Sequence, residues 1–183
     1  MRTHLLRLLP AALLALTFSA CDSNKPDDGA GEEEFFTRVT LTLAGSDGST
    51  ATAAATDPDG DKANIQYTTL ALKAGVTYTG AITLRDDING KDVTPEILGE
   101  SDEHQFFYTP GGAAAGRLTV TRTDTDANGL PIGLQFRAAV TAGAAAFGTL
   151  GVVLSHYDGI VKQADVRSPE TDLDLTFPVT ITP

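Results

Sequence analysis

The feature that most constrains the fold is an alternation of apolar and polar side chains with a period of two residues, which runs through most of the chain. In residues 37–44 every second side chain is apolar, namely Val39, Leu41 and Leu43, and residues 173–181 follow the same rule. Such alternation is typical of a strand with one buried and one solvated face. Since no segment carries a sustained apolar stripe of helical period, the chain is expected to fold into sheets.

Turn signals separate the alternating segments roughly every 8–12 residues. This spacing predicts an all-β fold, an antiparallel β-sandwich with an Ig-like two-sheet architecture and about nine strands. A two-lobed periplasmic binding fold is disfavoured because it needs alternating helices. One helical turn is expected, with Thr94 as its cap and Pro95 at its first position. The nine strands are expected at residues 37–44, 49–55, 64–72, 76–84, 104–109, 117–123, 130–140, around 150–154, and at 173–181.

The first 21 residues have the pattern of an export signal. Arg2 and Arg7 precede an apolar run at 8–16, interrupted only by Pro10, and no acidic residue occurs in this stretch. The run is too short to span a bilayer, which takes about 20 apolar residues. Small residues then lead into Cys21. An ordinary signal peptide cleaved near residue 20, with Cys21 unmodified, is the alternative interpretation.

Ser19, Ala20 and Cys21 resemble the lipobox of bacterial lipoproteins, although Phe18 stands where that family prefers Leu. The resemblance implies removal of residues 1–20 and attachment of lipid to the Cys21 thiol. Cys21 is the only cysteine of the chain, so no disulfide can form. Stable anchoring needs two acyl chains or more. The expected location is the bacterial cell envelope, at the outer membrane on its periplasmic or surface face, with membrane lipid as partner through the anchor.

Residues 22–34 contain six acidic side chains, one lysine and no large apolar residue. Such a segment cannot bury enough surface to order itself, so residues 21–34 are expected to be a lipidated cysteine followed by a flexible spacer. Loss of residues 1–20 removes two basic residues and no acid, which leaves 11 basic against 24 acidic side chains and a net charge of −13. A nucleic-acid partner is therefore excluded, because phosphate binding needs a basic surface. The remaining residues, 35–183, are long enough to form a single domain around one core.

Three stretches, at 77–84, 102–108 and 124–134, are similar to those of a group of uncharacterised Gram-negative lipoproteins. This resemblance runs over most of the mature domain. It implies a shared fold and export route, and it implies no activity.

The sharpest candidate for a bound ion is calcium at Asp124, Asp126 and Asn128, which with Gly129 match the first half of an EF-hand loop. The twelfth position, where a bidentate acid is required, is Gln135. Two further acidic clusters occur at 57–61 and 86–92. Asp and Asn are also the residues that hairpin turns need, so a purely structural turn is the alternative.

No catalytic constellation is recognisable. His104 and His156 are the only histidines of the mature chain, no zinc spacing surrounds them, and both are expected at the surface or at a sheet edge. The chain has no G-x-S-x-G motif, and its lone cysteine is assigned to the anchor. The aromatic run Phe106, Phe107 and Tyr108 is expected to be core. The protein is therefore predicted not to be an enzyme and, calcium apart, to use no cofactor.

These observations favour a lipid-anchored envelope protein that acts as a non-enzymatic interaction or accessory module for an unknown partner. The alternative is a module that binds a small ligand or a glycan, with calcium assistance as one version. The two hypotheses differ in one structural expectation. Small-ligand binding requires a concave, partly apolar cavity with convergent polar groups.

Overall fold

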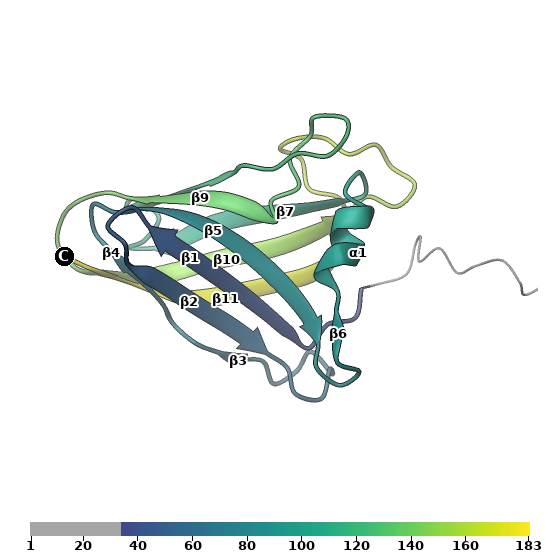
Figure 1. Cartoon of the computed structure of the whole chain (residues 1–183), viewed down its shortest axis with the longest axis horizontal. Helices are drawn as coiled ribbons and strands as arrows, with labels where there is room; N and C mark the ends of the chain where they lie inside the picture. Colours follow the sequence, from purple (N-terminus) through teal and green to yellow (C-terminus); the bar gives the residue numbers. More distant parts are fainter. Residues whose placement is uncertain (1–33) are drawn as a thin grey trace, which may run out of the picture. The chain divides into compact units, whose positions relative to one another are not determined.

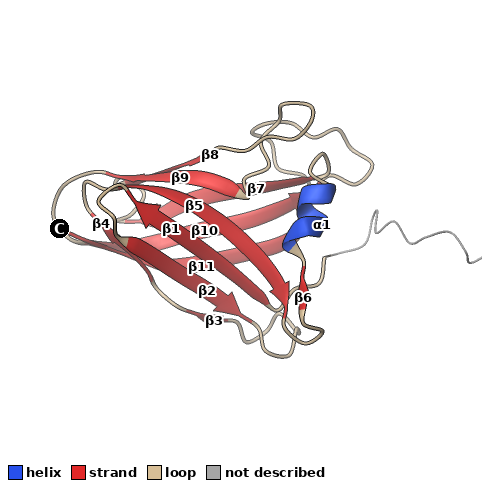
Figure 2. Cartoon of the chain, in the orientation of Figure 1, coloured by secondary structure: helices blue, strands red, loops and turns tan. Residues whose placement is uncertain are grey.

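The computed structural model describes residues 34–183, so the signal segment, Cys21 and most of the acidic spacer lie outside the described residues. The described chain forms two sheets that face each other across one core, which confirms the all-β sandwich (Figure 1). Strands account for most of it and α1 is its one helix (Figure 2). No helix in this part of the chain combines the length and apolarity that crossing a membrane would take.

The larger sheet has the order β3-β2-β1-β5-β9-β8, with β6 paired to β5, and the smaller sheet has the order β4-β11-β10-β7. The larger sheet contains β1 (Arg38–Gly45), β2 (Thr50–Thr56), β3 (Gln66–Tyr67), β5 (Thr77–Asp86), β6 (Lys91–Asp92), β8 (Leu118–Arg122) and β9 (Gln135–Val140). The smaller sheet contains β4 (Leu70–Lys73), β7 (His104–Gly112), β10 (Ala146–His156) and β11 (Glu170–Thr182).

The alternation in the sequence determines which face of each strand is buried. In β11 the five odd-numbered apolar residues from Leu173 to Ile181 are all buried, and β1 buries Val39, Leu41 and Leu43. Large side chains from both sheets, including Phe136 and Phe177, fill the space between them. Burial of these side chains is the main favourable term in folding.

The predicted strand at 64–72 is wrong in one respect, because it is two strands in different sheets. β3 pairs with β2, and the chain then crosses to the smaller sheet, where β4 pairs with β11 in parallel, Leu70 opposite Val179. Thr68 ends the first pairing, since its amide donates to the Ala54 carbonyl and its hydroxyl accepts from the Ala54 amide. The smaller sheet is therefore mixed and not purely antiparallel.

The short helix α1 (Thr94–Gly99) forms where a helical turn was predicted, but Thr94 does not cap it. Val93 occupies the N-cap position without a side-chain hydrogen bond. The Thr94 hydroxyl instead accepts from the Leu84 amide at 2.9 Å, and this bond fixes the helix against β5. Ile97 is buried beneath it. As Figure 1 shows, α1 lies at the end of the sandwich away from the C-terminus, and the chain leaves it to enter β7.

Candidate functional site

Two histidines and one aspartate meet inside the sandwich at the end beside α1. His104 begins β7, His156 ends β10, and the two residues lie opposite each other in the strand register. Each has the same parity as the core residues of its own strand, Phe106 on β7 and Leu154 on β10, so both side chains point inward. Their rings stack with centroids 4.6 Å apart and planes inclined by 16°.

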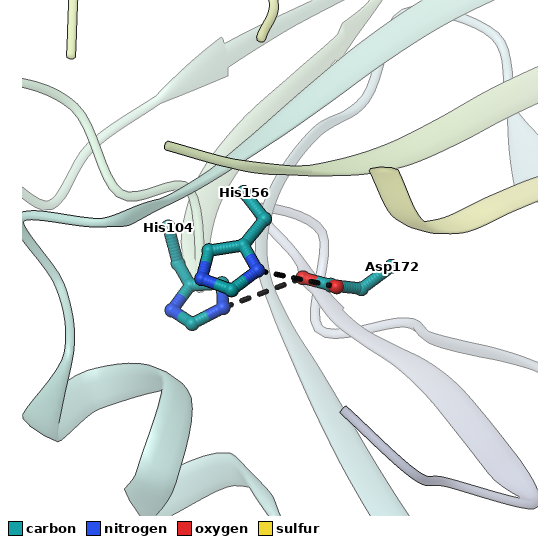
Figure 3. Close-up of side chains that lie close together, drawn as sticks. All are labelled: His104, His156 and Asp172. Atoms are coloured by element: carbon teal, nitrogen blue, oxygen red, sulfur yellow. Dashed lines mark ion pairs between the residues drawn. The ribbon is translucent and has the colours of Figure 1, made fainter. Parts of the chain in front are cut away.

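The third member of this group, Asp172, is placed by a β-bulge. Leu154 faces Leu173 and Ser155 faces Thr171, so Asp172 has no partner on β10. Regular alternation would put Asp172 on the outer face with the exposed Asp174. The bulge turns it inward, where it is 5% exposed. Figure 3 shows its carboxylate facing both imidazoles.

The three side chains lie close together, but they do not form a complete set of hydrogen bonds. Nε2 of His104 lies 3.3 Å from Oδ2 of Asp172, and Nδ1 of His156 lies 3.6 Å from Oδ1. Even so, Nε2 of each histidine and Oδ2 of Asp172 lack a well-formed hydrogen bond with any described residue. Buried polar atoms are nearly always paired, so three such atoms in one cluster indicate that the site has a further occupant or an unusual charge state.

The surroundings of His104 are acidic. Its Nδ1 lies 3.2 Å from the Glu100 backbone carbonyl, and the Glu100 carboxylate is 3.8 Å away. Burial lowers the pKa of His104, but the nearby Asp172 carboxylate, the Glu100 carbonyl and the charge of Glu34 outweigh it, so this pKa is raised overall. Burial also raises the pKa of Glu34, and the neighbouring Glu100 and Asp172 carboxylates add to that shift against the opposing charge of His104.

Asp172 also lies on the wall of a cavity of about 440 Å³ that opens between the start of β1, the end of β2 and the start of β11. This volume is within the range of small-molecule sites. Asp57, 6% exposed, is a second acid on the wall, and its Oδ1 has no hydrogen-bond partner in the described chain. The remaining lining is Phe36, Thr37, Arg38, Val39, Ala55, Lys62, Ile65, Thr171, Leu173, Asp174 and Leu175.

The predicted surface position of the histidines is wrong. His104 is fully buried and His156 is 5% exposed. Strand parity was the signal available in the sequence, because His104 is two residues from Phe106 and His156 is two residues from Leu154. The core assignment of the aromatic run holds for Phe106, whereas Phe107 is half-buried on the outer face, with the guanidinium groups of Arg122 and Arg167 4.9 Å and 5.4 Å from its ring centroid.

The predicted calcium loop does not line the cavity or join the histidine cluster. Asp124 accepts hydrogen bonds from the Gly133 and Gln135 amides, one on each carboxylate oxygen. Oδ1 of Asp126 accepts from the amides of Asn128 and Leu130.

The second oxygen of Asp126, Oδ2, lies 3.0 Å from the ammonium of Lys162, and the Asn128 side chain is exposed. These bonds give the loop residues a structural role, since each carboxylate holds the chain of its own turn. Calcium binding here stays a prediction, which a calcium titration followed by melting temperature would check.

The fold and the site together define a β-sandwich with an acidic, partly apolar end cavity and a buried histidine–carboxylate cluster. Neither protein-family models, nor curated proteins, nor solved structures give a match to this chain. The functional assignment therefore rests on the geometry of the site.

Proposed function

We propose that this chain is a lipid-anchored binding protein of the bacterial envelope, without catalytic activity, that holds a small molecule in the end cavity. The observation that carries the proposal is the cavity itself, because its wall combines two buried carboxylates, Asp57 and Asp172, with several apolar side chains. A concave site with few polar groups is what small-ligand binding requires. The cavity favours this hypothesis over an interaction module that contacts its partner through loops alone.

The lining selects the chemistry of the ligand. Oδ1 of Asp57 and Oδ2 of Asp172 are acceptors without hydrogen bonds, and ionised carboxylates can only accept. The pKa of Asp59 is raised chiefly by a hydrogen bond to the Asp57 carboxylate, so Asp59 can donate to Asp57 only while it holds its proton. A ligand that satisfies these two oxygens must supply O–H or N–H donors, and Phe36, Val39 and Ile65 offer it an apolar surface. A sugar unit, with several hydroxyls and an apolar C–H face, fits these requirements.

Sugar binding predicts that the melting temperature of the mature chain rises with the concentration of a matching mono- or oligosaccharide, by mass action. Asp57→Asn keeps the acceptor for the Lys62 amide and replaces the free oxygen with a donor. Loss of one charge-assisted hydrogen bond is worth about 1.5–3 kcal/mol, so isothermal titration should show affinity lower by about tenfold or more. Asp158→Asn, at an exposed loop position, is the matched control.

A panel of neutral, acidic and amino sugars that produces no saturable shift would contradict a glycan ligand. If only simple organic amines bound, the ligand class would be an amine instead of a sugar, and the cavity would still be the binding site. If Asp57→Asn and the parent bound the sugar with equal affinity, the cavity would not be the binding site.

The anchor is tested at Cys21. Cells grown with an alkyne-tagged fatty acid should label the parent chain, and Cys21→Ser should abolish the label because the thiol that carries the lipid is gone. Two acyl chains give stable attachment, so the parent should sediment with membranes. Ser23→Ala should label and sediment as the parent does. Undiminished labelling of Cys21→Ser would overturn the anchor without bearing on the cavity.

A further inference from the structure

We propose that His104, His156 and Asp172 form a binding site for a divalent transition metal ion, for which zinc best matches the donor set. The three side chains can each offer one ligand atom such that all of these atoms lie within 4.8 Å of one another, and all three residues are buried. The inference does not depend on the membrane anchor or on a sugar ligand, although Asp172 also borders the cavity.

The spacing of the donor atoms suits tetrahedral zinc. Zinc bonds to imidazole nitrogen and carboxylate oxygen are about 2.0–2.1 Å long, which puts the ligand atoms of a tetrahedral site about 3.3–3.4 Å apart. The two imidazole-to-carboxylate distances in the cluster, 3.3 Å to Oδ2 and 3.6 Å to Oδ1 of Asp172, are each close to that value. Because the two rings stack with planes inclined by only 16°, an ion between these atoms requires the imidazoles to turn until their lone pairs converge, within a cluster that three paired strands already hold together.

The protonation of His104 prepares it to be a ligand. A carbonyl oxygen can only accept, so the contact of Nδ1 with the Glu100 carbonyl requires the proton on Nδ1. In the neutral ring Nε2 then carries a lone pair, and that lone pair lies 3.3 Å from a carboxylate oxygen. Two electron pairs at this distance repel unless a cation or a proton lies between them. Metal-bound histidines typically donate their other N–H to a backbone carbonyl or carboxylate in this way.

The unpartnered atoms point to the same occupant. Nε2 of His104 and Oδ2 of Asp172, both in side chains at least nine-tenths buried, have no hydrogen bond in the described chain. Coordination would satisfy both. Glu34 and Glu100 surround His104 with further negative charge, and a divalent cation would compensate it.

The donor set also selects the kind of metal. Calcium and magnesium prefer sites built from oxygen ligands, whereas a site with two imidazoles and one carboxylate suits zinc and its neighbours in the first transition row. A water molecule would complete four-coordination. Asp172 on the cavity wall gives the ion a route from solvent.

The test uses the purified mature chain, stripped of metal and titrated with Zn²⁺ against a chromogenic zinc indicator. We expect one ion bound per chain, a melting temperature that rises with Zn²⁺ concentration, and no competition from a large excess of Ca²⁺. His156→Ala and Asp172→Asn should each weaken binding at least about tenfold, since even outer-shell changes cost that much. Glu170→Gln, exposed on β11 beside the bulge, should bind as the parent does.

If the variants do not fold, a spectroscopic measurement on the parent chain still tests the metal site. Co²⁺ should bind with the visible absorption bands of a tetrahedral N/O site, and Zn²⁺ should displace it. Absence of saturable Zn²⁺ binding would overturn the site. Binding unchanged in a folded His156→Ala variant would also overturn it, by moving the ion to other acids such as the 57–61 cluster. Neither result decides the sugar proposal, because that proposal is tested separately by sugar binding to the Asp57→Asn variant.

Discussion

Replacing Lys162 with methionine should destabilise the folded chain by about 3–5 kcal/mol, the cost of leaving a charge buried without its partner. The ammonium of Lys162 lies 3.0 Å from Oδ2 of Asp126, and these side chains are only 2% and 1% exposed. Lys162 also donates to the Ser101 carbonyl at 2.6 Å. The pair therefore joins the loop after β10 to the loop between β8 and β9, and methionine fills the space while removing the charge.

Burial acts on the two charges with different results. Burial raises the pKa of Asp126, but hydrogen bonds from the Leu130 and Asn128 amides and from Lys162 outweigh it, and the net pKa is lowered. Burial dominates at Lys162, whose pKa is lowered despite the Asp126 partner, because it has fewer compensating contacts. A carboxyl with a lowered folded pKa adds stability above its unfolded pKa of about 3.9, and that stability is lost as pH falls through the folded value. The Lys162→Met penalty should therefore shrink in acid.

Urea unfolding at neutral pH and near pH 3 measures both effects. Lys91→Met is the matched control, because the Lys91–Glu96 pair is 57% and 39% exposed and surface pairs contribute about 0–1 kcal/mol. The Lys162→Met/Asp126→Asn double variant should lose less than the sum of the single losses. An additive result would mean that the two side chains do not act as a pair.

Phe136→Ala should cost about 3–5 kcal/mol, the usual range for truncating a fully buried phenylalanine. The Phe136 ring, on β9, lies over Gly80 of the neighbouring β5, where a Cβ atom would collide with it. Its other neighbour is Tyr108 of the opposite sheet, with ring centroids 4.7 Å apart. This one side chain therefore ties the two sheets together.

Phe147→Ala is the control for this prediction, since Phe147 is 73% exposed and surface substitutions are usually within about 0.5 kcal/mol. Gly80→Ala should destabilise the parent chain and be nearly harmless in the Phe136→Ala background, where the space is free. Denaturant midpoints of the parent and of the four variants measure these effects. A Gly80→Ala penalty that persists without the ring would show that backbone strain, and not the ring, forbids a side chain there.

Much of the fold could be predicted because its signal is local. The alternation in 37–44 and 173–181 identifies β1 and β11 and the faces that they bury. The alternation breaks at the crossing between β3 and β4, because Tyr67 and Leu70 lie three residues apart and would face opposite sides of one continuous strand, but the break does not show which strands they pair with. Strand pairing depends on partners that are distant in the sequence, which a period of two residues does not name.

The candidate site was missed for related reasons. Asp172 carries the wrong parity for a buried residue, and only the bulge between β10 and β11 turns it inward. The position opposite His104 is occupied by His156, 52 residues away in the chain, so no short motif records the pair. The calcium pattern at 124–129 was visible because it is contiguous, and its carboxylates hold their own loop. Cys21 and the membrane location stay predictions.

The crossing from β3 to β4 has a consequence for crowding. Residues 66–73 form an edge strand of each sheet. Two of these residues pair in the larger sheet and four pair in the smaller sheet. Such short borders offer a neighbouring molecule few free amides and carbonyls to extend. Where copies of the chain meet at high local density, this side of the sandwich gives them little on which to nucleate a shared sheet.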